Sequence, residues 1–277
     1  MNLSVVIATL GRPELIETIE ALYNNSIQPV EVLVCIPKSI ELPAGIEIFE
    51  GVRVVRTDKG GQVYQRSIGF KAAKCELIMQ LDDDVIMECR AIETLLTSFS
   101  TIEQKRAIAP TFYWSGTNKR TYDGKHTGFW RKIIDWVANG KDGRLPGIVS
   151  LSGLNFGLCF DDEKEKIHRS QWLSGGCVLH HVNDLVTFDY FPYVGKAYAE
   201  DVMHSFLLKE KGVDLFVCRD ATAYIKEDPY SLSFREFYRQ YRAAEYAAKL
   251  WNKNLLRLKI YYITKFCFFN IIKLLGK

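Results

Sequence analysis

Short apolar runs of strand length alternate with amphipathic stretches along the first third of the chain. Four runs have this length: Leu3–Thr9, which is rich in β-branched residues, Glu31–Ile36, Val52–Thr57 and Leu77–Leu81. Helical periodicity separates them, with Pro13 suited to a first helical turn and Gln62–Ala73 forming a second helix. Strands joined by crossover helices form parallel sheets with both faces covered. The alternation predicts an α/β fold with a mixed, mainly parallel sheet flanked by helices.

Composition fits a globular protein of this class. The 277 residues are 48% hydrophobic and 25% charged, which excludes a disordered or collagen-like chain. No stretch of about 18 uncharged apolar residues is present, so we expect no conventional membrane span. The first residues lack the basic segment of a signal peptide, which predicts a cytoplasmic location. The seven cysteines are scattered without a CxxC pair, and we expect them to act as small buried hydrophobic residues.

Charge is distributed unevenly along the chain. After Glu245 the sequence has no acidic residue and seven basic ones: Lys249, Lys253, Arg257, Lys259, Lys265, Lys273 and Lys277. Without these seven, 29 basic residues face 33 acidic ones, so residues 1–245 carry a net charge of about −4. A uniformly basic nucleic-acid-binding protein lacks such a division, so we expect no nucleic acid as a partner.

The basic tail also carries many aromatic and aliphatic side chains. Lys249, Lys253 and Arg257 recur at every fourth position and form one stripe on a helix. Aromatic side chains at a membrane interface, with lysines among anionic headgroups, produce peripheral binding. The tail is therefore predicted to bind the inner face of the cell membrane. The alternative is a helix that packs on the rest of the chain or on the second subunit of a homodimer.

The stretch from about residue 111 to 170 differs from what precedes it. It contains many glycines and the aromatic residues Tyr113, Trp114, Trp130 and Trp136. Long connections of this composition are more often binding loops than core, so we expect loops here. The globular pattern returns at Gln171. Beyond it the sequence predicts a strand at Val213–Cys218 and an aromatic helix at Phe234–Tyr246.

Three adjacent carboxylates, Asp82, Asp83 and Asp84, follow the fourth apolar run. In an extended segment the first and the third point to the same side. A divalent cation relieves their mutual repulsion, and carboxylate oxygens suit Mg²⁺ or Mn²⁺ shared with substrate phosphates. The alternatives are a solvated acidic turn or the acids of a helix N-terminus. Ligands bind beyond the carboxyl ends of parallel strands, so the three acids lie at the predicted site.

Further short motifs follow one another in a defined order. They are Thr9 and Arg12, Asp58-Lys59-Gly60-Gly61, Gln65-Arg66-Ser67-Ile68-Gly69, the three aspartates, Trp172-Leu173-Ser174-Gly175-Gly176-Cys177, Phe188-Asp189 and Tyr198-Ala199-Glu200-Asp201-Val202. In order and spacing the series resembles the family-2 glycosyltransferases over about residues 1–228. The resemblance implies inverting sugar transfer and a GT-A fold, the Rossmann-like fold of nucleotide-diphospho-sugar transferases. It is greatest to bacterial enzymes of surface-polysaccharide assembly, such as capsule or O-antigen.

The resemblance implies a role for each matching residue. Asp82 would lie near the donor ribose, and Asp84, with Asp82 beside it, would hold the Mg²⁺ or Mn²⁺ that bridges the donor diphosphate. Asp201 would be the general base that deprotonates the acceptor hydroxyl, with Glu200 as its usual neighbour. The other implied donor contacts are Thr9, Arg12 and Arg66. The loop under the acceptor and the donor sugar would contain Trp172, Gly175 and Gly176.

Two positions depart from the family pattern. Where many members carry an aspartate for the nucleobase, this chain has Ile36-Pro37-Lys38-Ser39, so we expect Asp58 to take part in base recognition. Where many carry a histidine as a further metal ligand, it has Lys226, which would contact the diphosphate as a point charge. His204 matches no motif, and we expect it at the surface.

These observations combine into one expected function. The chain is expected to move a sugar from a nucleotide-diphosphate sugar to a hydroxyl of a glycan acceptor, itself expected to be lipid-linked. Residues 1–228 would form the catalytic domain and residues 229–277 a helical, membrane-associating extension. One alternative is an inactive glycosyltransferase-like adaptor, against which the complete set Asp82, Asp84 and Asp201 argues. The other is a sugar-1-phosphate nucleotidyltransferase, for which Thr9–Pro13 is too poor in glycine and basic residues.

Overall fold

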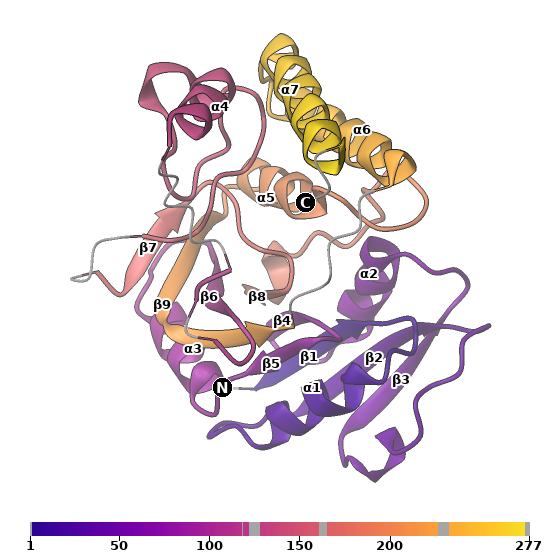
Figure 1. The fold of residues 1–277 in the computed structure, drawn as a ribbon. Helices are drawn as coiled ribbons and strands as arrows, with labels where there is room; N and C mark the ends of the chain where they lie inside the picture. The colour runs from indigo at the N-terminus through magenta and orange to yellow at the C-terminus, as the bar shows by residue number, and fades with distance from the viewer. Residues whose placement is uncertain (1, 118, 122–127, 161–164, 227–232, 275–277) are drawn as a thin grey trace.

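The computed structural model describes residues 2–274 except 118, 122–127, 161–164 and 227–232. The strands are β1 (Leu3–Ala8), β2 (Glu31–Pro37), β3 (Val52–Thr57), β4 (Leu77–Asp82), β5 (Val85–Met87), β6 (Arg106–Trp114), β7 (Ile167–Ser170), β8 (Cys177–His181) and β9 (Asp214–Ile225). The α-helices are α1 (Glu14–Tyr23), α2 (Gln62–Ala72), α3 (Ala91–Ser100), α4 (Phe129–Asn139), α5 (Glu200–Glu210), α6 (Phe234–Leu250) and α7 (Leu255–Leu274). One mixed sheet has the strand order β3-β2-β1-β4-β8-β6-β9-β5, with β7 paired to β9 (Figure 1).

The first four strands form the parallel half of the sheet. β1 pairs in parallel with β2 and with β4, and β2 pairs in parallel with β3. Every residue of β1 and β2 is buried, because helices cover both faces of this half. The predicted α/β architecture is confirmed here, with strand ends that differ from the prediction by one residue at most.

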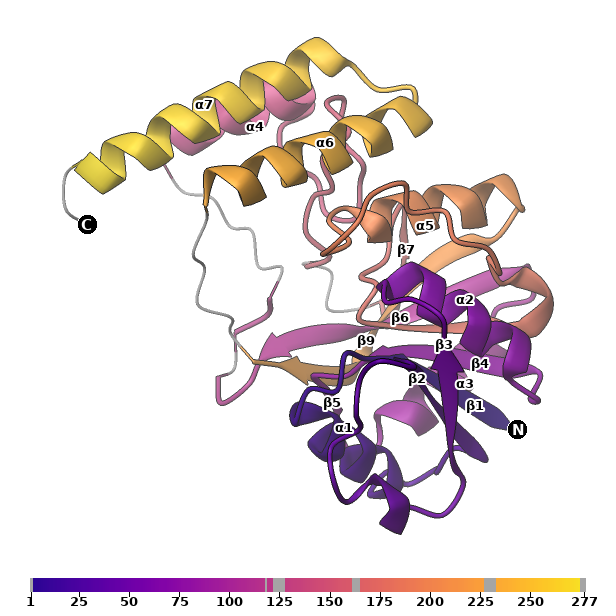
Figure 2. The same cartoon turned by 90° about the vertical axis from the view of Figure 1, so that its right-hand side faces the viewer.

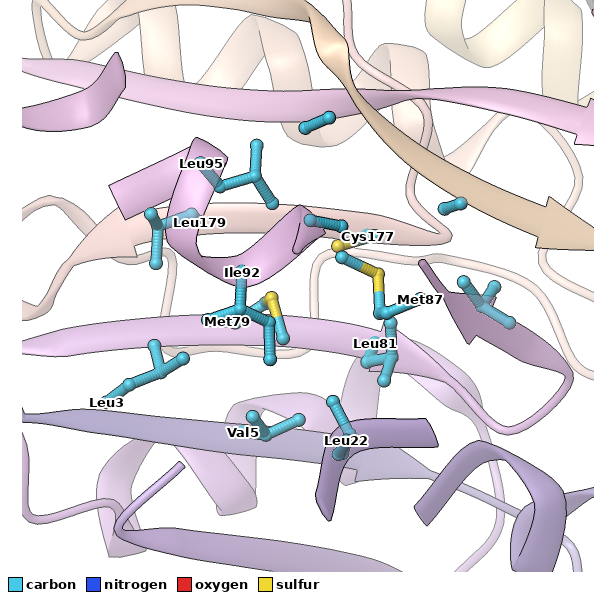
Figure 3. Close-up of a cluster of buried hydrophobic side chains, with 14 of the residues drawn as sticks. Leu3, Val5, Leu22, Met79, Leu81, Met87, Ile92, Leu95, Cys177 and Leu179 are labelled. Carbon is cyan, nitrogen blue, oxygen red and sulfur yellow. The ribbon is translucent and has the colours of Figure 1, made fainter. Parts of the chain in front are cut away.

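Alternate residues of β1 face different helices. Leu3 and Val5 belong to the cluster formed with α1 and α3, as Figure 3 shows for their neighbours on β4 and α3. Val6 belongs to the opposite cluster, which it forms with α2. Within α2, Gly69 lies so close to Val6 and Cys35 that a Cβ atom would overlap both side chains. This close approach seats α2, the helix that carries Arg66, against the sheet.

The second half of the sheet is mixed. β8 runs antiparallel to both β4 and β6, and β9 runs parallel to β6 and antiparallel to β5. The predicted strand Val213–Cys218 is too short, because β9 continues to Ile225. The register between β6 and β9 skips residues 219–221, where polar residues interrupt the apolar pattern that the prediction followed.

Besides α2, the helices α4, α5, α6 and α7 lie on the face of the sheet away from α1 and α3 (Figures 1 and 2). α5 packs against α6, α6 packs against α7, and α7 also packs against α4. Helix α4 corrects the expectation of loops between residues 111 and 170, because glycines and aromatic residues there concealed a helical period. α6 begins with a capping box formed by Ser233 and Glu236 and continues four residues past its predicted end at Tyr246.

The C-terminal helical extension is present as predicted, in α6 and α7. The predicted boundary between residues 228 and 229 lies outside the described residues, as does Lys277. Within the described part of the chain, no helix combines the length and the apolar character needed to cross a membrane.

Candidate active site

A buried arginine joins four segments that are distant in the sequence. Arg66, on α2, is 3% exposed, and its Nη1 donates to Glu200 Oε1 at 2.7 Å. Its Nη2 donates to Asp82 Oδ1, at the end of β4, and to the carbonyl oxygen of Gly175 at 2.8 Å. Burial alone lowers the pKa of Arg66, but the charges of Glu200 and Asp82 raise it above its ordinary value, so the guanidinium remains charged. We call Arg66, Asp82 and Glu200 the inner cluster.

Two glycines border the inner cluster, and one of them, Gly175, allows it to form. A Cβ atom on Gly175 would overlap Glu200 Oε1 and would lie 3.5 Å from Arg66 Nη1. A Cβ atom on Gly176 would lie 3.6 Å from Asp82 Oδ2. Only a glycine at position 175 lets the backbone carbonyl approach the guanidinium while the carboxylate occupies the space beside it. The structure thus brings Gly175 and Gly176 together with Asp82, Arg66 and Glu200.

Asp201 lies next to the inner cluster in the first turn of α5. Ala199, before it, has φ 54° and ψ 19°, a left-handed conformation that is uncommon outside glycine. Burial, followed by the negative charge of Glu200, raises the pKa of Asp201 to about 7. A carboxylate with a pKa near neutrality can accept a proton from a bound hydroxyl.

The three aspartates adopt a turn and do not continue the strand as predicted. β4 ends at Asp82, and residues 83 and 84 form the turn that leads into β5. The Thr9 hydroxyl donates to Asp83 Oδ2, and burial raises the pKa of Asp83 to about 6. The turn directs Asp83 into the protein and leaves Asp84 at the rim. There Arg12 Nη1 donates to Asp84 Oδ2 at 2.8 Å.

Two further predicted donor residues lie outside the inner cluster. Asp58 forms an ion pair with Lys38 at 2.7 Å, and both side chains are exposed. Lys226, at the end of β9, forms an ion pair with Glu17 of α1 at 2.9 Å. We call these two pairs and the Arg12–Asp84 pair the rim. Its members Arg12, Lys38, Asp58 and Asp84 follow the carboxyl ends of β1, β2, β3 and β4, where an α/β sheet binds its ligands. Lys226 follows β9, whose last residue, Ile225, pairs with Val85 directly after Asp84.

Trp172 is a core side chain beneath the site. It is 0% exposed, and its Nε1 donates to the carbonyl oxygen of Phe156 at 2.7 Å. A side chain with no exposed surface supports the loop above it, so we assign Trp172 to holding the loop that carries Gly175 and Gly176 and not to direct contact with a substrate.

Sequence reasoning missed the polar partners that complete the site. The Tyr190 hydroxyl donates to Glu200 Oε2 at 2.8 Å, and Gln62 Nε2 donates to Asp82 Oδ1 at 2.7 Å. Gln62 precedes Arg66 by four residues on α2, so helical spacing was a usable signal. Tyr190 follows the Phe188-Asp189 motif by one residue and offered a weaker one.

His204 contradicts the expectation of a surface histidine. It is 4% exposed and stacks on Tyr190 with ring centroids 5.7 Å apart. Burial lowers its pKa to about 3, so it is neutral at physiological pH. The α5 face that bears His204 turns toward the sheet, where the ring of His180 on β8 lies 5.4 Å from the His204 ring. His204 therefore belongs to the packing behind Glu200.

A divalent cation fits at the rim only if substrate phosphates complete its coordination. Within the described ranges, no group of three or more His, Cys, Asp or Glu side chains is arranged to hold a metal ion. Asp84 is 30% exposed and bears a carboxylate at the edge of the site, with Asp82 two residues before it. Mg²⁺ often binds through one or two carboxylates together with substrate phosphates, and Mn²⁺ accepts the same oxygen ligands. The donor set present fits this mode.

Comparison with known proteins agrees with the geometry. No curated protein sequence matches the chain. Its structure is similar to that of GalNAc-T7, crystallised with UDP, GalNAc and Mn²⁺, with a TM-score of 0.63 and 16% identity over 94% of this chain and 50% of that one. The complex of S. aureus TarS 1–349 with UDP-GlcNAc gives a TM-score of 0.53 and 12% identity over 90% and 66% of the two chains.

The chain thus spans half the length of the GalNAc-T7 chain that it matches. At these identities the likeness concerns the fold, which is the GT-A fold of these glycosyltransferases. The sequence model described as "Glycosyl transferase family 2" matches residues 4–164, a segment that includes Arg12, Arg66 and the three aspartates. This segment is more than half of the chain, which is therefore a member of glycosyl transferase family 2.

Proposed function

We propose that this chain is an inverting glycosyltransferase that moves a sugar from a nucleotide-diphosphate sugar to a hydroxyl of a glycan acceptor. The observation that carries the proposal is the inner cluster. Arg66 ties Asp82, at the donor end of β4, to Glu200, the neighbour of Asp201. The Asp201 carboxylate, whose pKa is about 7, is therefore held at a fixed position beside the strand ends where a donor would bind.

The residues of the chain divide the chemistry between them. Asp201 Oδ accepts the proton of the acceptor hydroxyl as that oxygen attacks the anomeric carbon. Arg12 and Lys226, both cationic and at the rim, attract the donor diphosphate. A Mg²⁺ or Mn²⁺ ion on Asp84 and Asp82, when bound, supplies charge that stabilises the departing diphosphate. One base on one face of the sugar favours in-line displacement, and with it inversion.

Uridine nucleotides are the first donors to test. The similar structures contain UDP in GalNAc-T7 and UDP-GlcNAc in TarS. In this chain, the exposed pair Asp58 and Lys38 lies where β2 and β3 end, and we propose it as the contact to the nucleobase. The Mn²⁺ in the GalNAc-T7 structure makes that ion the natural first choice for the assay.

The acceptor is proposed to be lipid-linked and to belong to a bacterial surface polysaccharide. This proposal rests on the family resemblance of the motifs and on the acid-free, aromatic tail. It places the enzyme at the inner face of the cell membrane, with residues 1–228 as the transferase domain and residues 229–277 as its membrane-associating extension.

A donor screen tests the proposal. The full chain, with Mn²⁺, is incubated with UDP-GlcNAc, UDP-GalNAc and other nucleotide sugars, and release of nucleoside diphosphate is measured. We expect release from at least one donor, loss of it in Asp84→Asn, and wild-type release in Glu210→Gln. Glu210 is the matched control because it is an exposed carboxylate at the other end of α5. If no donor is hydrolysed, or if Asp84→Asn has wild-type activity, the proposed site is wrong.

A further inference from the structure

Helix α4 presents an exposed aromatic face. Phe129 is 72% exposed and Trp136 is 58% exposed, and their spacing of seven residues places them on one side of the helix. Lys132 is exposed as well and lies between them on the same side. Large aromatic side chains are costly to leave in water, so an exposed pair with a lysine between them indicates a contact surface.

Helix α7 also has an exposed apolar face with a lysine beside it. Leu256, Ile260 and Ile263 are 67%, 43% and 63% exposed, at the spacing of one helical face. Lys259 borders this stripe and is exposed. The opposite side of α7 is already used, because Leu258 and Tyr262 are buried in a cluster with Ala244 and Ala248 of α6.

The two faces belong to one structural unit. Arg257 of α7 donates to the carbonyl oxygens of Trp136 and Val137 at 3.0 Å each, and so caps the C-terminal end of α4. Its guanidinium also lies 5.7 Å from the centre of the Trp136 ring. Figures 1 and 2 show α4 and α7 next to each other at the end of the molecule farthest from β3.

We propose that α4 and α7 together form a surface that binds an anionic lipid bilayer. We call it the lipid surface and define it by Phe129, Lys132 and Trp136 on α4 and by Leu256, Lys259, Ile260 and Ile263 on α7. The inference deepens the proposed function, on which it rests for the lipid-linked acceptor. It adds α4, a helix from the middle of the chain, to the tail.

Charge identifies the occupant of the lipid surface. The sequence has no acidic residue after Glu245, so α7 contributes only cations. The acid of α4, Asp135, is largely buried and lies 3.4 Å from Arg144. Apolar side chains with cations around them match the acyl region and the anionic headgroups of a bilayer. A second copy of the chain fits less well, because a symmetric contact would set the same basic surfaces against each other.

The lipid surface also lies on the side of the molecule that carries Asp201. α5, α6 and α7 are packed in succession. Packed helices lie about 8–10 Å apart, so the axis of α5 is at most about 20 Å from that of α7 where the three helices pack. A glycan on a lipid carrier would then need only a short extension from the bilayer to reach the first turn of α5.

Vesicle cosedimentation of the full chain tests the lipid surface. The probe is phosphatidylcholine vesicles with or without phosphatidylglycerol, and the variants are Phe129→Ser/Trp136→Ser and Lys132→Glu. Ile48→Ser is the matched control, since Ile48 is 73% exposed but lies in the 3₁₀ turn between β2 and β3. We expect wild-type and control protein to bind the anionic vesicles. The double variant should bind at least about tenfold more weakly, and Lys132→Glu several-fold more weakly.

Three outcomes would overturn this inference. If wild-type protein does not bind anionic vesicles, α4 and α7 do not form a lipid-binding surface. If both α4 variants bind the vesicles as tightly as wild-type protein does, only the tail contacts the bilayer and α4 is not part of the lipid surface. A dimer in sedimentation velocity that Lys132→Glu strengthens, without vesicle binding, would assign the surface to a second copy of the chain. Donor hydrolysis without acceptor is measured in parallel: it should be unchanged in every variant, and its absence from wild-type protein would count against the proposed function alone.

Discussion

The inner cluster and the rim each pair an arginine with carboxylates, but the two arginines lie in opposite surroundings. Arg66 is 3% exposed and is shared by two carboxylates and a backbone carbonyl, whereas Arg12 is 44% exposed and meets Asp84 at the edge of the site. A buried charge whose partner is removed carries its full desolvation cost, whereas water replaces the partner of an exposed one. The comparison indicates that the inner cluster holds the site in shape while the rim remains available to a charged ligand.

Replacing each arginine by methionine should separate the two regions most strongly. Arg66→Met leaves Glu200 buried without its cation and also removes the cation from the partly exposed Asp82, so we expect the free energy of unfolding to fall by about 3–5 kcal/mol. Arg12→Met removes a solvated pair and should cost about 0–1 kcal/mol. Urea denaturation of the two variants measures both. Equal losses would show that burial does not distinguish the regions.

Gly175→Ala tests the inner cluster without removing a charge. The new methyl group would overlap Glu200 Oε1, so the carboxylate has to move away from Arg66. Overpacking of this kind typically costs about 1–3 kcal/mol. Gly60→Ala is the control, because its methyl group would make ordinary contacts at 3.5 Å and 3.6 Å. If the Gly175→Ala and Gly60→Ala proteins are equally stable, the inner cluster can accommodate the added methyl group without strain.

Asp84→Asn should affect stability little and activity strongly. The substitution keeps the size of a side chain that is 30% exposed, so we expect a change in unfolding free energy of about 0–1 kcal/mol. It removes the charge proposed to hold a cation, so transfer should be lost and added Mn²⁺ should not restore it. Thermal melts and transfer assays on one preparation compare the two effects. A large loss of stability would move Asp84 into the structural class with Arg66.

Lys226→Ala should have the smallest effect. Lys226 and Glu17 are 52% and 57% exposed, so their ion pair is well solvated and the melting temperature should not change measurably. If Lys226 contacts the donor diphosphate, the KM for the donor should rise at low ionic strength and this difference should shrink as salt is added. An unchanged KM at all salt concentrations would remove Lys226 from the donor site.

The sequence predicted the elements of the inner cluster better than their contacts. The apolar runs specified β1 to β4 and placed Asp82 at a strand end, and the resemblance selected Arg66 and Glu200. The hydrogen bonds among them could not be predicted, because 134 positions separate Arg66 from Glu200 in the sequence and local periodicity carries no information over that separation. The turn at Asp83 was missed because β4 was assumed to continue, while the Thr9 hydroxyl holds Asp83 inward.

The helical end of the molecule was harder to predict. The apolar positions of α4 follow a helical period, but the surrounding glycines favoured loops. The burial of His204 depends on Tyr190, which lies in a different segment and is not marked by helical spacing. The helix α4 was therefore missed because two local signals disagreed, whereas the burial of His204 rests on a tertiary contact that local sequence does not reveal.

The pH dependence of sugar transfer tests the role of Asp201 most directly. Only the ionised carboxylate can accept the acceptor proton, and its pKa of about 7 predicts that kcat/KM rises with pH through an apparent pKa near 7. In Asp201→Asn this rise should disappear, and kcat should fall by roughly 10²–10⁴-fold with donor affinity almost unchanged. An Asp201→Asn enzyme that keeps both its kcat and the pH-dependent rise, while losing donor affinity, would contradict the account.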